Sequence, residues 1–195
     1  MPYQINISKQ FLINTPFGQN RIMMETKSIP EGFENITPHL VVKDAAKAID
    51  FYKKVFGAEE MYRRTIPGND SKIVHSVLTI RASKIMVVDE FPEMCGEEKS
   101  GEKIGSPKSI GGNSVFLNMY FDDVDAIYKK ATEEGASGIM PPCDVFWGDR
   151  YGQIKDPFGH IWEIATHKKD MTTDELDKAA AEFFDQMAKN KQTKQ

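Results

Sequence analysis

The sequence predicts an α+β fold built by duplication, in which two strand–helix–three-strand (βαβββ) modules at about 36–90 and 114–167 surround a small-molecule pocket. Three observations predict this fold. A strand, a capped helix and three short strands occur twice in the same order. The helix cap, two apolar helix positions and the terminal glycine recur 78 positions later. The connection at about 91–113 is rich in glycine and charge, which is typical of a solvated loop.

The first module opens with the alternating, β-branched stretch ITPHLVV, which predicts a strand. Asp44 predicts the N-cap of a helix with one apolar face, and Gly57 predicts its left-handed C-terminal stop. The remaining strands are predicted at about 59–65, 74–80 and 84–89.

The second module repeats this order. VFLNMYF predicts a strand, Asp122 or Asp123 predicts a helix N-cap, and Gly135 predicts the end of that helix. The remaining strands are predicted at about 138–145, 150–155 and 160–166. The shared offset between Asp122 and Asp44, and between Gly135 and Gly57, therefore indicates a duplicated scaffold.

The segments outside the modules are simpler. Residues 1–35 are expected to be an irregular N-terminal extension, and three interpretations stay open: a tag, an extension before a start at Met23 or Met24, or a swapped edge strand. For 169–195, a capping box of Thr172 and Glu175 predicts a helix. Its apolar stripe is expected to dock on the domain or on a dimer mate, and consists of Leu176, Ala180, Phe183, Phe184 and Met187.

Composition excludes several functions. The formal net charge is -4 and no basic cluster occurs, so we expect no nucleic-acid partner. No apolar run approaches the roughly 18 residues of a membrane span, and the first residues lack the features of a signal peptide. Cys95 and Cys143 have neither metal-like spacing nor a disulfide framework, which favours a reducing cytoplasm.

Two stretches, TPHLVVKDAAKAIDFYKKVFGAEE and PPCDVFWGDRYGQIKDPFGHIWEIATH, resemble the vicinal oxygen chelate superfamily, which contains glyoxalases, bleomycin-resistance proteins and extradiol dioxygenases. They are most similar to its demethylubiquinone methyltransferase-like (PhnB-like) branch. The resemblance implies paired modules whose sheets curl into a cup, usually in a homodimer. No Gly-rich nucleotide-binding turn follows a strand, so we do not expect methyl transfer.

The resemblance also implies where a metal ion would bind. Metal-using relatives carry ligands at the positions of Thr37, Val87, Val115 and Glu163. Only Glu163 is a competent ligand, whereas a catalytic metal site normally takes at least three protein side chains. We therefore predict no standard metal site and leave the cofactor unassigned.

One alternative metal site stays open. His39 lies two residues after Thr37 and therefore shares its face of the strand, and His75 could face inward from the third strand. Together with Glu163 these two histidines would supply three ligands.

The remaining candidate residues lie near one end of the expected cup. Glu163 is interpreted either as a general base or as a partly solvated carboxylate paired with Arg150. Trp147, Arg150 and Tyr151 form either a gate for a planar or anionic ligand, or local packing with an Arg150–Asp149 surface pair.

Two functions compete. The sequence favours a homodimeric protein that binds a small molecule in the cup, with His39, His75, Trp147, Arg150 and Tyr151 as ligand contacts. The alternative is a metal-dependent lyase, isomerase or dioxygenase that uses Glu163 with the two histidines.

Overall fold

The computed structural model describes residues 10–14, 20–24, 27–92 and 105–192. Contacts divide the chain into two units, 1–36 and 37–195. The first unit contains an antiparallel pair, β1 (Gln10–Asn14) and β2 (Asn20–Met24), where an irregular extension or a swapped edge strand was expected. Within the described residues, no helix combines the length and apolar character needed to cross a membrane.

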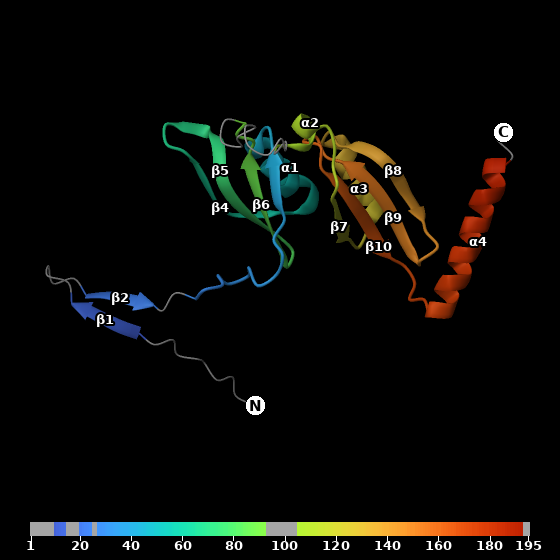
Figure 1. The fold of residues 1–195 in the computed structure, drawn as a ribbon, viewed down its shortest axis with the longest axis horizontal. Helices are drawn as coiled ribbons and strands as arrows, with labels where there is room; N and C mark the ends of the chain where they lie inside the picture. Colours follow the sequence, from blue (N-terminus) through green and yellow to red (C-terminus); the bar gives the residue numbers. More distant parts are fainter. Residues whose placement is uncertain (1–9, 15–19, 25–26, 93–104, 193–195) are drawn as a thin grey trace, which may run out of the picture. The chain divides into compact units, whose positions relative to one another are not determined.

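The second unit contains the two βαβββ modules, which confirms the expected fold class (Figure 1). The first module consists of β3 (His39–Val42), α1 (Ala45–Phe56), β4 (Glu59–Ile66), β5 (Asn69–Ile80) and β6 (Ser83–Asp89). The second consists of β7 (Phe116–Tyr120), α3 (Val124–Glu133), β8 (Ser137–Asp144), β9 (Asp149–Lys155) and β10 (Ile161–His167). A short helix α2 (Pro107–Ile110) precedes β7, and α4 (Thr173–Gln192) follows β10.

Local side chains set the helix boundaries. The Asp44 carboxylate accepts a hydrogen bond of 3.1 Å from the amide of Lys47, and Gly57 ends α1 with a φ of 68°. Asp123 is the N-cap of α3 and accepts from the amide of Ala126 at 3.0 Å. Gly135 follows that helix with a φ of 97°.

The two sheets have the same topology. Their strand orders are β3-β6-β5-β4 and β7-β10-β9-β8, with the first and last strands of each module parallel and adjacent. His39 pairs with Met86 and Asn118 pairs with Glu163. His39 and Asn118 each lie five residues before the N-cap of the following helix, so these two pairs are equivalent under the duplication.

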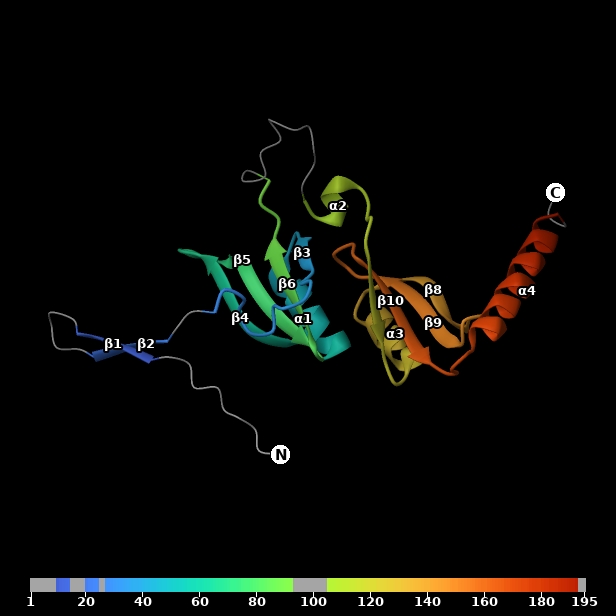
Figure 2. The same cartoon turned by 60° about the horizontal axis from the view of Figure 1, so that its bottom comes forward.

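One hydrophobic core joins the modules. Helices α1 and α3 contact each other between the two sheets (Figure 2). The buried indole of Trp162 from β10 packs on Tyr52 and Phe56 from α1, with ring centroids 5.4 Å and 4.5 Å apart. The helix-facing sides of both sheets therefore form the core, and each sheet has an outer face on the opposite side. In one copy these two outer faces do not enclose a common cup.

The C-terminal helix begins with the predicted capping box. The amide of Thr172 donates to the Glu175 carboxylate at 2.8 Å, and the amide of Glu175 donates to the Thr172 hydroxyl at 3.3 Å. Phe183 and Phe184 contact Phe146, with centroids 5.2 Å and 6.1 Å apart. Two residues of the apolar stripe of α4 thus contact the second module, while Phe184 and Met187 remain 60% and 43% exposed.

Candidate functional site

A carboxylate surrounded by neutral hydrogen-bond donors lies on the outer face of the second sheet. The Tyr151 hydroxyl donates to Oε1 of Glu163 at 2.6 Å. The Gln153 side-chain amide donates to the Tyr151 hydroxyl at 2.7 Å and approaches Oε1 at 3.4 Å. The Asn118 amide approaches Oε2 at 3.4 Å. We call Asn118, Tyr151, Gln153 and Glu163 the Glu163 cluster.

Strand pairing builds this cluster from three strands. Glu163 in β10 lies directly between Asn118 of β7 and Gln153 of β9. Tyr151 is two residues from Gln153 and therefore shares its face of β9. Asn118 and Gln153 were not identified from the sequence, although Asn118 is a polar residue between Phe116 and Tyr120 on one face of β7.

The electrostatics of the cluster favour hydrogen bonding to a ligand. Burial, and then the hydrogen bond to Glu163, raise the pKa of Tyr151 to about 12, so the phenol keeps its proton at neutral pH. An ionised carboxylate accepts several hydrogen bonds, and Oε2 of Glu163 receives only the long contact from Asn118 among the described side chains. Oε2 can therefore accept an N–H or O–H group of a ligand.

Aromatic side chains adjoin the cluster and are anchored on Asp149, which is only 3% exposed. Its carboxylate accepts from the Tyr120 hydroxyl at 2.8 Å and from the Trp147 indole at 3.0 Å. His167 Nδ1 lies 2.8 Å from the same carboxylate. Trp147 also packs edge-on against Tyr151, with centroids 5.5 Å apart. Asp149 therefore fixes a ring surface next to Glu163.

Arg150 lies elsewhere. Its guanidinium donates to Asp125 of α3 at 2.8 Å and to Asp144 at 3.3 Å, so it faces the helix layer. The structure contains neither of the ion pairs considered from the sequence, with Asp149 or with Glu163. Successive residues of a strand point to opposite faces, which separates Arg150 from Tyr151.

The two candidate histidines lie on the first sheet. His75 of β5 stacks on Tyr62, with centroids 5.6 Å apart and planes 4° from parallel. Burial, and then the charge of His75, lower the pKa of His39, so the two imidazoles are electrostatic neighbours. His39 also lines a groove of about 300 Å³ together with Val115 and His160. The Nδ1 atom of His75 is buried and has no hydrogen-bond partner among the described residues.

These residues do not fit a metal ion within one copy of the chain. His39 and His75 belong to the first sheet and Glu163 to the second, on the far side of the core. In the described part of the chain, no three His, Cys, Asp or Glu side chains come close enough to hold a metal ion. Cys95 lies outside the described residues, and Cys143 is a free thiol. Val87 is buried in the core.

Comparisons with known proteins agree with this fold. Residues 33–164 match the family model of the Glyoxalase/Bleomycin resistance protein/Dioxygenase superfamily. An uncharacterized protein of Mycobacterium bovis is 41% identical over 144 residues, which cover 74% of this chain and 90% of that protein.

Two solved structures share the architecture. The crystal structure of TioX from Micromonospora sp. ML1 is 26% identical, with a TM-score of 0.51 over 69% of this chain and 98% of TioX. The structure of a gene product from Arabidopsis thaliana is also 26% identical, with a TM-score of 0.51 over 68% of this chain and 98% of that protein.

Proposed function

The chain belongs to the glyoxalase/bleomycin resistance protein/dioxygenase superfamily, and on this premise we propose that it binds a small molecule at the Glu163 cluster. One observation carries this proposal. The Glu163 carboxylate is held by a phenol and two amides beside a ring surface, and this combination orients a ligand without a metal ion. Because a fold alone does not determine chemistry, the proposal rests on this site.

The cluster suggests the kind of ligand. Trp147 and Tyr120 offer ring surface for a planar or amphipathic molecule, and Oε2 of Glu163 offers an acceptor for its N–H or O–H group. Phe116 adds further apolar surface to the same sheet and is 52% exposed. A ligand that combines a ring with a hydrogen-bond donor would match both features.

We further propose that a second copy of the chain completes the cup. Large side chains remain exposed on both outer faces, among them Tyr62 on the first sheet and Phe116 and Tyr120 on the second. If the first sheet of one copy lies over the second sheet of another, both sets are covered. This homodimer would also bring His39 and His75 towards Glu163 of the other copy.

A ligand screen with matched variants tests binding. Candidate small molecules are identified by the rise in melting temperature that they cause in the wild-type protein. We expect Glu163→Gln to weaken binding of the confirmed ligands at least about tenfold, because the ligand loses a hydrogen bond to a charged group. Tyr151→Phe should weaken binding to a similar extent, because the phenol no longer holds the Glu163 carboxylate in place. Glu182→Gln on the exposed face of α4 is the control and should leave affinity unchanged. Equal affinities in all four proteins would overturn the proposal.

Sedimentation velocity tests the dimer separately. We expect the wild-type protein to sediment as a dimer, and Phe116→Lys to shift it towards monomer because a charge would be buried in the interface. A wild-type monomer at the highest concentrations measured would contradict this part of the proposal.

A metal-dependent enzyme is a second candidate, favoured by the buried, unpartnered Nδ1 atom of His75. Imidazole nitrogens bind zinc, nickel and iron. In the homodimer proposed above, Glu163 of the other copy would be the third ligand beside His39 and His75. The test is metal content after reconstitution with Zn²⁺, Ni²⁺ or Fe²⁺. One ion per chain that is lost in both His75→Ala and Glu163→Gln would establish the metal site that this function requires, whereas retention in His167→Ala is the control.

A further inference from the structure

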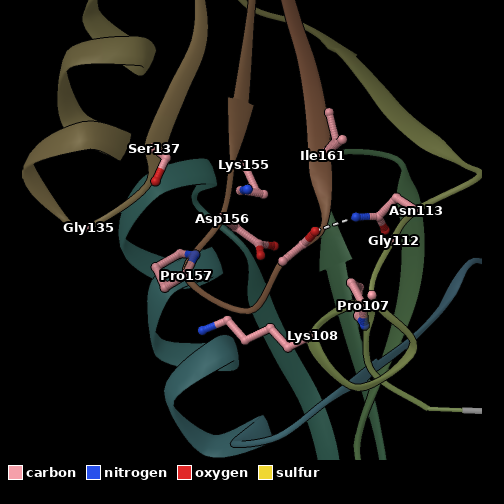
Figure 3. A pocket seen from close by; sticks show the side chains of 12 residues that line it. Pro107, Lys108, Gly112, Asn113, Gly135, Ser137, Lys155, Asp156, Pro157 and Ile161 are labelled. Atoms are coloured by element: carbon pink, nitrogen blue, oxygen red, sulfur yellow. Dashed lines mark hydrogen bonds between the residues drawn. The ribbon is translucent and has the colours of Figure 1, made fainter.

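A polar pocket of about 650 Å³ lies where β9 turns into β10, at one end of the second sheet (Figure 3). Its walls come from the segment that contains α2, from the start of β8 and from the β9–β10 turn. The Asn113 side-chain amide donates to the carbonyl oxygen of Gly159, which joins the first of these walls to the third. The pocket is thus built from segments that are held together.

The charged side chains that line this pocket and have no salt-bridge or hydrogen-bond partner among the described residues are both positive. Lys108 and Lys155 both line it, and neither forms a salt bridge with any carboxylate that the structure describes. Glu134, next to the lining residue Gly135, is already paired with Lys54 at 3.1 Å. Two ammonium groups at one pocket favour an anionic ligand.

The one carboxylate in the lining, Asp156, is satisfied from the core side. It is 3% exposed and accepts from the Tyr52 hydroxyl at 2.7 Å and from the Trp162 indole at 3.0 Å. The amides of Phe158 and His160 each donate to its other oxygen at 2.9 Å. Four donors thus offset its charge, and it offers no acceptor to a ligand in the pocket.

One row of residues that line the pocket lies next to the Glu163 cluster along the strands. Lys155 pairs with Ile161 in β10 and with Ser137 in β8, and all three line the pocket. Gln153 and Glu163 form the next pair of outer-face residues, two positions further along β9 and β10. This pair is therefore about 7 Å from the pair of Lys155 and Ile161. A single small molecule can reach from one row to the other.

We infer that this pocket binds the anionic end, a phosphate or a carboxylate, of the ligand whose N–H or O–H donor reaches Glu163. This inference rests on the proposed function of the Glu163 cluster. Lys155 and Lys108 supply the positive charge for one end of the ligand, and the Glu163 carboxylate supplies the acceptor for the other. The ligand class is therefore a small acid that also carries a hydrogen-bond donor.

Binding of inorganic phosphate tests the pocket by itself. The ¹⁵N-labelled protein is titrated with phosphate at constant ionic strength, and with acetate in parallel to identify the preferred anion. We expect saturable shifts in the amide resonances of Gly112, Asn113 and Ser137. Lys155→Met and Lys108→Met should each weaken binding at least fivefold, whereas Lys178→Met on α4 should not. Shifts that do not saturate, or that respond equally to all three substitutions, would overturn the inference.

A variant that keeps both lysines provides a second test. Gly112 lines the pocket, has no left-handed φ, and a Cβ added to it meets no atom within 4 Å. Gly112→Gln should therefore fold normally, occupy open space beside the pocket and weaken phosphate binding. If the phosphate affinity is unchanged both in Gly112→Gln and in Lys155→Met, the site does not lie in this pocket.

A pair of probes separates this inference from the proposed function. O-phosphoethanolamine carries an anion and a donor, whereas ethyl phosphate carries only the anion. We expect Lys155→Met to weaken both probes, and Glu163→Gln to weaken only O-phosphoethanolamine. If Lys155→Met weakens both and Glu163→Gln neither, the pocket stands and the Glu163 proposal fails. If Glu163→Gln alone has an effect, the pocket inference is overturned and the Glu163 proposal stands.

Discussion

The hydroxyl of Tyr151 in β9 donates a 2.6 Å hydrogen bond to the carboxylate of Glu163 in the neighbouring strand β10. Residue 163 lies opposite Gln153, and Tyr151 lies opposite Ala165, so the phenol reaches diagonally across the β9–β10 pair. A long aromatic side chain can span that diagonal. The bond holds the carboxylate of Glu163 on the outer face, where a ligand can meet it.

Replacing this phenol tests its contribution to stability. We expect Tyr151→Phe to lower the free energy of unfolding by about 1 kcal/mol, the typical net value of one hydrogen bond. Urea denaturation followed by circular dichroism measures the change. Tyr62→Phe is the matched control, because its ring still stacks on His75 and we expect little change. Equal losses in the two variants would contradict a specific role for the Tyr151 bond.

The pKa of Tyr151 provides an independent measurement. Burial raises it more than the hydrogen bond to Glu163 does, to about 12. Because the neutral phenol is favoured in the folded state, this stabilisation is complete below the unfolded pKa of about 10 and is lost as the pH rises towards 12. In Glu163→Gln we expect the pKa to fall without reaching 10. Ultraviolet titration measures this pKa in the wild type and in Glu163→Gln. In each protein, subtracting the titration of the same protein with Tyr151→Phe isolates the signal of Tyr151.

His167 should titrate above its ordinary pKa. The hydrogen bond to Asp149, and then the one to Asp170, raise its pKa above 6.5. The folded state thus favours the imidazolium, so this contribution to stability is complete below pH 6.5 and is lost as the pH rises through the folded-state pKa.

Proton NMR titration of the imidazole resonances tests this expectation. Asp149→Asn should lower the pKa of His167 more than Asp170→Asn does, because Asp149 is the stronger cause. His39 is an internal control, since burial lowers its pKa below 6.5. A His167 that titrates together with His39 would contradict the Asp149 bond.

Asp156 should be essential for stability because it joins the modules. Its carboxylate accepts from Tyr52 of the first module and from Trp162 of the second. Asp156→Ala would remove the acceptor of four donors, two of which are buried, and we expect a loss of about 3 kcal/mol in the free energy of unfolding. Urea denaturation measures it, with Asp122→Ala at an exposed carboxylate as control. A loss below about 0.5 kcal/mol would show that the contact does not hold the modules together.

Local signals predicted most of the scaffold. The N-cap at Asp44, the glycine stop at Gly57 and the capping box of Thr172 and Glu175 each depend on atoms within about five residues of one another. The alternation in ITPHLVV and VFLNMYF likewise predicted β3 and β7. The N-cap of α3 was narrowed only to Asp122 or Asp123, because both residues can cap a helix.

The sites depended on contacts that sequence spacing does not contain. One of the two interpretations of the sequence places Arg150 and Tyr151 at a common ligand gate, but β9 turns them to opposite faces, where Arg150 meets Asp125 of α3. Glu163 obtains one hydrogen-bond donor from Asn118, 45 residues away in the chain. Such partners follow from sheet register, which the burial of one face determines.

The sequence by itself determined the duplicated modules, the N-cap and glycine stop of the first helix and the capping box of the last. Only the tertiary structure decided which side chains surround the Glu163 carboxylate, and that His39 and His75 lie on an outer face turned away from it. The physical reason is the core: burying Trp162 against Tyr52 and Phe56 places α1 and α3 between the sheets. That packing turns the outer faces of the two sheets away from each other, so no pattern within one strand could show which of their residues meet.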